Sequence, residues 1–304
     1  MADKIATREA YGNALAELGD KYDFVVLDAD LAAATKTGVF KKKFPNRFFD
    51  CGIAEGNMVT VAAGIATTGK TVFASSFAMF AAGRAFEQVR NAIGYPHLNV
   101  KIGATHAGIS VGEDGATHQC NEDIALMRTI PGMTVICPAD GEEARAAVEA
   151  AINYVGPVYL RFGRAAVPYL YAGKDYKFEM GKGIVLAEGK DVTIVATGLM
   201  VHLALEAREL LKAEGIDAEV INIHTIKPID DELLARSAAK TGAVVTAEEH
   251  NIIGGLGGAV CESLASACPV PVVRVGVEDK FGKSGKVPVL LEEYGLRSEE
   301  HTSE

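Results

Sequence analysis

The segment from Thr105 to Gln119 concentrates residues that can do chemistry. It reads Thr-His-Ala-Gly-Ile-Ser-Val-Gly-Glu-Asp-Gly-Ala-Thr-His-Gln, with histidines at 106 and 118, two acids and three glycines. It follows an apolar run typical of a strand, and parallel sheets present their binding loops after strand ends. Histidine serves as acid, base or hydrogen-bond donor near neutral pH. The segment predicts a loop that binds a polyhydroxylated substrate; a purely structural loop is the alternative, and the spacing suits a tight metal cluster poorly.

A second candidate is Glu55, in the segment Cys-Gly-Ile-Ala-Glu-Gly-Asn-Met that starts at Cys51. It lies between a short apolar segment and a helix predicted to start near Asn57. Partial burial there raises the pKa of a carboxyl group, so that it can share a proton with a ring nitrogen near neutral pH. The alternative is an ordinary acid at a helix N-terminus, stabilised by the helix dipole.

Phe77 and Phe80 follow a strand end and two serines. Aromatic side chains three residues apart can stack on a flat heterocycle, and a pair within the core is the alternative.

Arg161 and Arg164 also lie just after a predicted strand. Guanidinium groups suit phosphate or carboxylate, and surface ion pairing is the alternative.

A glycine-rich segment, Ile253 to Gly258, precedes a predicted helix. It looks like a phosphate-binding loop but lacks the G-x-G-x-x-G spacing with a following ribose-binding acid. We therefore expect close backbone packing at the start of a helix.

Short apolar runs alternate with helical patterns along the whole chain, which is typical of a parallel sheet covered on both faces. The predicted strands cover residues 24–27, 71–74, 100–105, 134–137 and 158–162, and then 192–196, 218–223, 243–246 and 272–275. The pattern loosens around residues 165–190. The fold class is therefore α/β, with one doubly wound domain predicted over residues 1–182 and a second α/β domain over 183–304.

The composition narrows the classes of function. The 304 residues carry a formal net charge of -10 with both signs spread along the chain, which argues against nucleic-acid binding. No apolar stretch is long enough to cross a membrane, and the N-terminus shows no apolar signal core, so a cytoplasmic location is expected. The five cysteines form no close pair, which makes disulfides and structural zinc unexpected and predicts small buried hydrophobes.

Together these segments resemble the transketolase family over almost the full chain. The resemblance includes Ala6-Thr-Arg-Glu-Ala-Tyr-Gly-Asn, Leu27-Asp-Ala-Asp-Leu, the Glu55 segment, Ser76-Phe-Ala-Met-Phe, the loop up to Gln119 and Ala247-Glu-Glu-His-Asn-Ile-Ile-Gly-Gly-Leu-Gly. It implies a thiamine diphosphate enzyme that moves a two-carbon ketol unit between sugar phosphates, as in the pentose phosphate pathway. The two halves resemble the family's pyrimidine-binding domain and its C-terminal α/β domain.

The Gly-Asp-Gly of the family's diphosphate-binding domain does not occur in this sequence. The resemblance therefore implies that this chain is the C-terminal subunit of a two-chain transketolase. Its Met1 stands about where the second domain of a long transketolase would start. Its partner would be an N-terminal subunit that holds Mg²⁺ or Ca²⁺, so no metal ligand is expected here. Two copies of each chain are expected, with self-association through the same domain when the partner is missing.

For the cofactor, the resemblance implies one role for each motif. Glu55 is similar to the glutamate that contacts the pyrimidine ring nitrogen, and Phe77 and Phe80 to the aromatic residues that stack on the ring. Asp30 and Leu31 look like residues that lie near the cofactor of a facing subunit.

For the substrate, Asp114 and His118 resemble the pair that bonds donor and acceptor hydroxyls. His106, Arg8 and Arg164 resemble the groups that bind the sugar-phosphate end. The catalytic residues implied are Glu55, His118 and His106.

The sequence departs from the family in three places. Gly115-Ala116 stands where Gly-Pro is common, and the residues after Phe80 lack an aromatic that some relatives have. Where relatives carry a phosphate-binding serine, the chain has three alanines followed by Thr35 and Lys36, either of which is a candidate substitute.

Three rival classes remain. Deoxyxylulose-phosphate synthase usually has Arg-Ala-Gly and Gly-Ala-Asp-Gly where this chain has His106-Ala-Gly and Gly112-Glu-Asp-Gly. The beta subunit of a 2-oxoacid dehydrogenase would lack the loop with two histidines. A non-catalytic protein that retains the fold is the third rival, because fold alone does not settle function.

Overall fold

A seven-stranded sheet forms the centre of the first domain, in the order β12-β6-β7-β5-β4-β2-β3. The computed structural model describes residues 4–173 and 176–298. Six strands of this sheet are parallel: β2 (Phe24–Asp28), β3 (Phe48–Asp50), β4 (Thr71–Phe77), β5 (Val100–Thr105), β6 (Thr134–Ile136) and β7 (Val158–Arg161). Nearly all residues of β2, β4, β5 and β7 are buried, which explains why continuous apolar runs predicted them. The three-residue strand β3 was not predicted.

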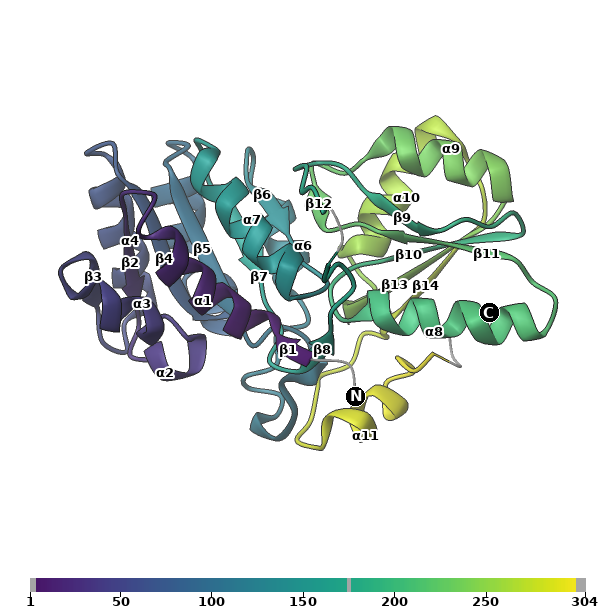
Figure 1. The fold of residues 1–304 in the computed structure, drawn as a ribbon, viewed down its shortest axis with the longest axis horizontal. Coiled ribbons are helices and arrows are strands. Elements are labelled where there is room, and N and C mark those ends of the chain that lie inside the picture. Colours follow the sequence, from purple (N-terminus) through teal and green to yellow (C-terminus); the bar gives the residue numbers. More distant parts are fainter. Residues whose placement is uncertain (1–3, 174–175, 299–304) are drawn as a thin grey trace.

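Helices cover both faces of this sheet (Figure 1). One face packs against α1 (Thr7–Leu18), α3 (Gly38–Lys43) and α7 (Gly141–Asn153). The other face packs against α4 (Glu55–Ala66), the π-helical turns η2 (Met79–Arg84) and η3 (Val89–Gly94), α5 (Phe86–Gln88) and α6 (Asp123–Arg128). The short elements α2 (Ala32–Thr35), η1 (Pro45–Arg47) and η4 (Ile109–Asp114) lie in the connecting loops.

The second domain is a five-stranded sheet in the order β14-β13-β10-β11-β9. Its strands are β9 (Ile184–Ala187), β10 (Val192–Ala196), β11 (Ala218–Asn222), β13 (Val244–Asn251) and β14 (Val272–Val277). Its helices are α8 (Met200–Ala213), α9 (Asp231–Thr241), α10 (Leu256–Ala267) and α11 (Val287–Glu293). In Figure 1, α8 lies on one side of this sheet and α9 and α10 on the other. The antiparallel strand β9 was not predicted, because its four residues are only half-buried.

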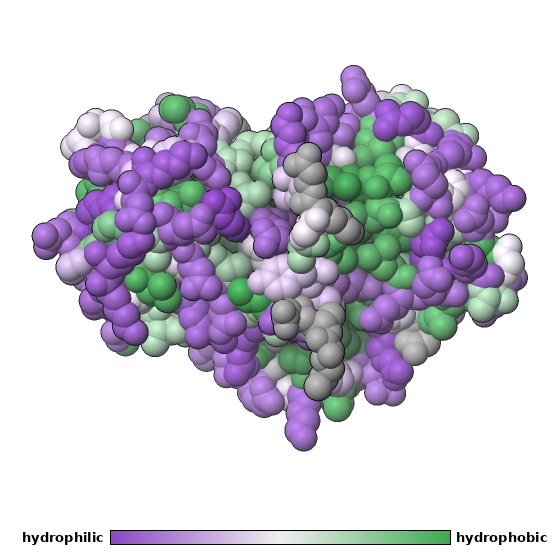
Figure 2. All heavy atoms as spheres, in the orientation of Figure 1, coloured by the Kyte–Doolittle hydropathy of each residue, from purple (hydrophilic) through white to green (hydrophobic). Residues whose placement is uncertain are grey.

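Both halves contribute to their junction. The strand β12 (Thr225–Lys227) comes from the second half and pairs antiparallel with β6 at the edge of the first sheet. The strands β1 (Lys4–Ala6) and β8 (Ala166–Pro168) form a small antiparallel pair, which lies below β12 between the two sheets in Figure 1. Figure 2 shows two lobes with a notch between them, and hydrophobic residues gather on the second lobe beside the junction. The two-domain α/β fold predicted from the sequence is confirmed.

Arg161 is a buried electrostatic link across this junction. Its Nε donates to Asp123 Oδ2 at 2.9 Å, and its Nη2 donates to the carbonyl oxygen of Glu249, in β13, at 3.0 Å. Tyr159 also donates to Asp123 Oδ2, at 2.9 Å. Arg161 therefore joins the domains, whereas Arg164, three residues later, donates to Val111 within the candidate substrate loop.

Within the described ranges, no helix is long and apolar enough to cross a membrane, and no three metal-binding side chains cluster. All five cysteines are free. Cys120 and Cys137 are buried, but the other three are only half-buried, so the prediction of buried cysteines holds for two of the five.

We predict that Arg161→Met lowers the free energy of unfolding by about 3–5 kcal/mol, because Asp123 then remains buried without its cation. Chemical denaturation of the isolated chain measures this loss. Lys70→Met is the control, because Lys70 and Asp23 form an exposed pair whose loss costs at most about 1 kcal/mol. Equal losses in the two variants would contradict the assignment of Arg161 as a buried link.

Candidate active site

All the predicted site residues except Arg8 lie at or after the carboxyl end of a strand of the seven-stranded sheet. Parallel strands send these ends to one edge of the sheet, where binding loops of such folds gather. The predicted residues lie after β2 (Asp30, Leu31), after β3 (Glu55), at the end of β4 (Phe77, Phe80), after β5 (His106, Asp114, His118) and after β7 (Arg164). Arg8, in the first turn of α1, joins them because its backbone N–H donates to the carbonyl oxygen of Gly163.

Half of the predicted residues line one pocket of about 420 Å³. They are Asp30, Leu31, Glu55, Phe80 and His118. Ala29, Ile53, Thr117 and Arg84 complete the wall. The pocket thus combines a buried carboxylate, an aromatic ring and a histidine from three different loops.

Glu55 is the first residue of α4, two residues before the predicted start of that helix, and is only 3% exposed. Its two carboxylate oxygens accept hydrogen bonds from Arg84 Nη1 at 3.0 and 3.1 Å. The Arg84 guanidinium also lies 4.5 Å above the ring centre of Phe80. A planar cation therefore lies on the aromatic ring and bonds the buried acid.

Sequence reasoning missed Arg84. It lies at the end of the π-helical turn η2, which begins beside Phe80 and returns the chain toward Glu55. Single π-helical turns are rare and are frequently found at functional sites. An arginine a few residues after a candidate stacking aromatic was the only available signal.

The two phenylalanines and two histidines form one aromatic cluster. Phe77 stacks on His106 at 3.8 Å and on Phe80 at 5.7 Å between ring centroids. His118 meets the Phe80 ring edge-on at 5.4 Å. Phe77 is buried and Phe80 is half-buried. Phe80 therefore lines the pocket, and Phe77 packs behind it.

His106 is buried in the left-handed backbone region, with φ of 56°. Its Nε2 lies 3.0 Å from Arg8 Nη1, and its Nδ1 lies 2.9 Å from Thr105 Oγ1. Because a guanidinium only donates, Nε2 accepts and Nδ1 carries the proton of a neutral ring. Burial, and then the charge of Arg8, lower the pKa of His106 to about 3. His106 therefore acts at neutral pH as an acceptor that orients Arg8.

Two arginine side chains, Arg8 and Arg164, lie next to the residues just described: Arg8 beside His106 and Arg164 beside Asp114. Arg8 Nη1 also donates to the carbonyl oxygen of Ala34 at 2.8 Å, whereas its buried Nε has no hydrogen-bond partner in the described part of the chain. Arg164 Nη1 donates to the carbonyl oxygen of Val111 and lies 3.8 Å from Asp114 Oδ2. Burial lowers the pKa of Arg8, with a further contribution from Arg164. These two guanidinium groups are suited to an anion.

Asp28 orders the loop that carries Asp30 and Leu31. Its carboxylate accepts hydrogen bonds from Thr35 Oγ1 at 2.7 Å, Thr37 Oγ1 at 2.8 Å and the Leu31 N–H at 2.6 Å. Burial raises the pKa of Asp28 to about 6.

Thr35 is fully buried and its hydroxyl is bound to Asp28, so of the two candidate substitutes for a phosphate-binding serine only Lys36 keeps an accessible group. Lys36 pairs with Glu9 at 3.4 Å and is about a third exposed.

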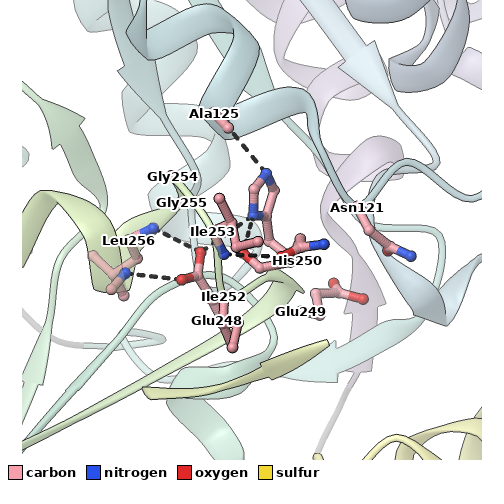
Figure 3. Close-up of polar contacts among 12 residues, drawn as sticks. Asn121, Ala125, Glu248, Glu249, His250, Ile252, Ile253, Gly254, Gly255 and Leu256 are labelled. Carbon is pink, nitrogen blue, oxygen red and sulfur yellow. Dashed lines mark hydrogen bonds and ion pairs between the residues drawn. The ribbon is translucent and has the colours of Figure 1, made fainter. Parts of the chain in front are cut away.

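The glycine-rich segment holds one of the chain's own carboxylates at the N-terminus of α10 (Figure 3). Glu248 accepts from the N–H groups of Leu256 and Gly257 at 2.6 and 2.8 Å. A Cβ atom at Gly255 would lie 2.0 Å from Glu248 Oε2. His250 Nε2 accepts from the Ala125 N–H of the first domain at 3.3 Å. The expectation of close backbone packing is confirmed, and Glu248 occupies the position that a phosphate would take.

Two family models match successive parts of the chain. The model of the transketolase pyrimidine binding domain matches residues 3–169, and the model of the transketolase C-terminal domain matches residues 181–300. The chain therefore belongs to the transketolase family, whose members use thiamine diphosphate.

The relatives show which part of a transketolase this chain resembles. The chain is 54% identical over 295 residues to the "Putative transketolase C-terminal section" of Methanocaldococcus jannaschii, covering 96% of this chain and 92% of that protein. It is 47% identical to the "6-deoxy-6-sulfo-D-fructose transketolase subunit SqwH" of Clostridium sp. (strain MSTE9), covering 96% and 91%. The solved structure "Split gene transketolase, inactive beta4 tetramer" matches with a TM-score of 0.90 and 56% identity, covering 99% of this chain and 97% of that chain. The predicted similarity to the C-terminal subunit of a split transketolase is confirmed.

We predict that the two partners of the Glu55–Arg84 pair are not equivalent for stability. Arg84→Met leaves a buried carboxylate without a cation and should lower the free energy of unfolding by about 1–3 kcal/mol. Glu55→Gln leaves Arg84, whose side chain is 55% exposed, to water and should cost less. Urea denaturation of both variants compares them, and a larger loss for Glu55→Gln would contradict the prediction.

We predict a pH dependence that belongs to His106. Because its pKa is about 3 in the fold and about 6.5 when unfolded, the unfolded chain takes up a proton that the folded chain excludes. This contribution to stability is complete above pH 6.5 and falls by about 1.4 kcal/mol per pH unit below it, toward pH 3. Urea denaturation between pH 7 and 5 should show a shallower fall for His106→Gln than for the wild type. Parallel curves would refute the assignment.

Proposed function

We propose that this chain is a catalytic subunit of a two-chain transketolase, active in the cytoplasm in the pentose phosphate pathway. It would transfer a two-carbon ketol unit between ketose and aldose sugar phosphates with thiamine diphosphate. One observation carries the proposal. The pocket around Glu55, Phe80 and His118 lies at the same sheet edge as the arginine pair Arg8 and Arg164.

The pocket fits the aminopyrimidine ring of thiamine diphosphate. The planar guanidinium of Arg84 already bonds the Glu55 carboxylate and lies over the Phe80 ring. A flat nitrogen heterocycle needs the same two partners, an acid at its edge and an aromatic face. The bound cofactor supplies an electron sink at the carbon that is transferred.

The chain's own residues then have distinct tasks toward the cofactor. Glu55 would hold a proton at the ring nitrogen, where burial keeps water away from the carboxyl group. Phe80, backed by Phe77, would orient the ring. Asp30 and Leu31, expected near the cofactor of a facing subunit, line the same pocket as Glu55 and would contact the same cofactor, which the facing subunit would hold by its diphosphate.

The substrate would extend from this pocket toward the arginine pair. His118 and Asp114 would bond the sugar hydroxyls, with His118 able to move a proton. Arg8, oriented by His106, and Arg164 would bind the anionic end, and the buried Nε of Arg8, which has no hydrogen-bond partner among the described residues, would be a further donor. A sulfonate has the same charge, and one relative is named for a sulfofructose, so 6-deoxy-6-sulfofructose is a second donor to test.

A partner would complete the site. The N-terminal subunit would carry the diphosphate group and its Mg²⁺ or Ca²⁺, in an assembly with two copies of each chain. Two large apolar side chains are exposed in this part of the chain: Ile53 in the pocket wall, at 79%, and Phe49 in β3, at 45%. Exposed apolar patches mark protein interfaces, which supports a partner at this face. Without its partner, the chain would associate with itself through this face.

The test is a ketol-transfer assay with xylulose 5-phosphate and ribose 5-phosphate, thiamine diphosphate and Mg²⁺. We expect activity only when the chain is mixed with the N-terminal subunit from the same source. Glu55→Gln should lower the activity of the mixture by at least about a hundredfold, the usual scale of a lost proton-transfer group. Glu232→Gln, at an exposed acid of the second domain, is the matched control.

Sedimentation confirms that the two chains assemble in each mixture. An assembled complex without transfer activity would overturn the proposal. Turnover with pyruvate as donor would then favour a synthase, and no turnover with any donor would favour a non-catalytic protein.

A further inference from the structure

We propose that the second domain positions the substrate loop, residues 106–119, and that Gln119 is the positioning residue through which it acts. The segment 281–287 of the second domain, here called the strap, holds the loop. The inference rests on the proposed function only where it concerns substrate binding. It assigns a task in the reaction to a domain that contributes none of the predicted site residues.

Gln119 connects the loop to the strap. Its side chain is 2% exposed, and its amide nitrogen donates to the carbonyl oxygens of Ile109 at 3.1 Å and Lys283 at 3.0 Å. Ile109 lies near the start of the loop and belongs to the hydrophobic core of the second domain, together with Leu290. One buried amide therefore joins both ends of the loop to the second domain.

The three glycines of the loop allow this contact. Gly108, Gly112 and Gly115 all have positive φ, and each faces an atom of the second domain. A Cβ atom at Gly108 would lie 2.4 Å from Glu249 Oε2, and one at Gly115 would lie 2.4 Å from Ser284 Oγ. The Ser110 N–H also donates to Glu249 Oε2, at 3.1 Å. The glycine pattern that predicted a binding loop therefore also reflects packing between domains.

The strap is shaped to receive Gln119. A Cβ atom at Gly282 would lie 1.9 Å from Gln119 Oε1, so no larger residue fits while Gln119 keeps its position. Gly282 does not have a positive φ, and the close approach is therefore its main constraint. Asp114 and His118 lie between the fixed points of the loop, where Asp114 is exposed and the half-buried His118 lines the pocket.

A loop that is fixed before the sugar arrives does not lose freedom when the sugar binds. Release of the strap should therefore weaken substrate binding and leave cofactor binding intact. We expect Gly282→Ala in the assembled two-chain enzyme to raise KM for donor and acceptor about tenfold. We expect kcat to stay within about twofold and the thiamine diphosphate affinity, measured by calorimetry, to stay unchanged.

Gly258→Ala is the matched control, because Gly258 lies in helix α10 of the same domain and a Cβ atom there meets only the ends of two long side chains, Arg128 at 3.4 Å and Glu262 at 3.8 Å. Gln119→Glu is the second variant. It keeps the shape of the side chain, removes the donor and should reproduce the rise in KM if Gly282→Ala does not fold. An unchanged KM in a folded, assembled Gly282→Ala or Gln119→Glu enzyme would overturn the positioning role.

Amide hydrogen exchange on the chain alone tests the strap without any activity measurement. Residues 106–119 should exchange at least tenfold faster in Gly282→Ala, or in Gln119→Glu if Gly282→Ala does not fold, than in Gly258→Ala. The residues of β5 should not change. Unchanged exchange in the loop would overturn the inference even if transfer activity is present. A wild-type mixture with no transfer activity would instead overturn the proposed function, and the exchange result would still decide whether the strap holds the loop.

Discussion

A parallel sheet brings the carboxyl ends of all its strands to one edge, and the candidate site depends on this constraint. Residues from position 30 to position 164 meet because β2, β3, β4, β5 and β7 are neighbours in the sheet. The strands β2 and β5 are buried along their whole length, so they expose no side chain to a ligand. The candidate site residues therefore lie at strand ends and in the loops that follow, and the loop after β5 contributes three of them, His106, Asp114 and His118.

Burial at this edge creates a second requirement, because every charged group there needs a partner. Glu55 is paired with Arg84, Arg8 bonds the neutral ring of His106, and Asp28 accepts from two threonine hydroxyls. These contacts give the pocket its shape. The guanidinium of Arg84 covers one face of the Phe80 ring in this arrangement.

The sequence predicted those parts of the fold that depend on local pattern. The runs at 100–105 and 158–162 became β5 and β7 because buried parallel strands are continuously apolar. The strands β9 and β12 escaped prediction, since β9 is half-buried and β12 pairs with a distant strand of the other domain. Arg84 was missed for a similar reason, because its pairing depends on a π-helical turn. The domain boundary near residue 183 and the roles of the site residues stay predictions.

The division into two domains separates two physical tasks. The first domain carries all the candidate site residues. Its loop from His106 to Gln119 contains three glycines, which would make the loop mobile if nothing held it. The second domain contributes buried contacts to that loop, through Glu249 and the carbonyl oxygen of Lys283. Because glycine has no side chain, atoms of the second domain come close to the loop backbone at all three positions. The residues that would make a free loop flexible therefore also allow the second domain to hold it. Precision at the site therefore depends on the junction between the domains as much as on the pocket itself.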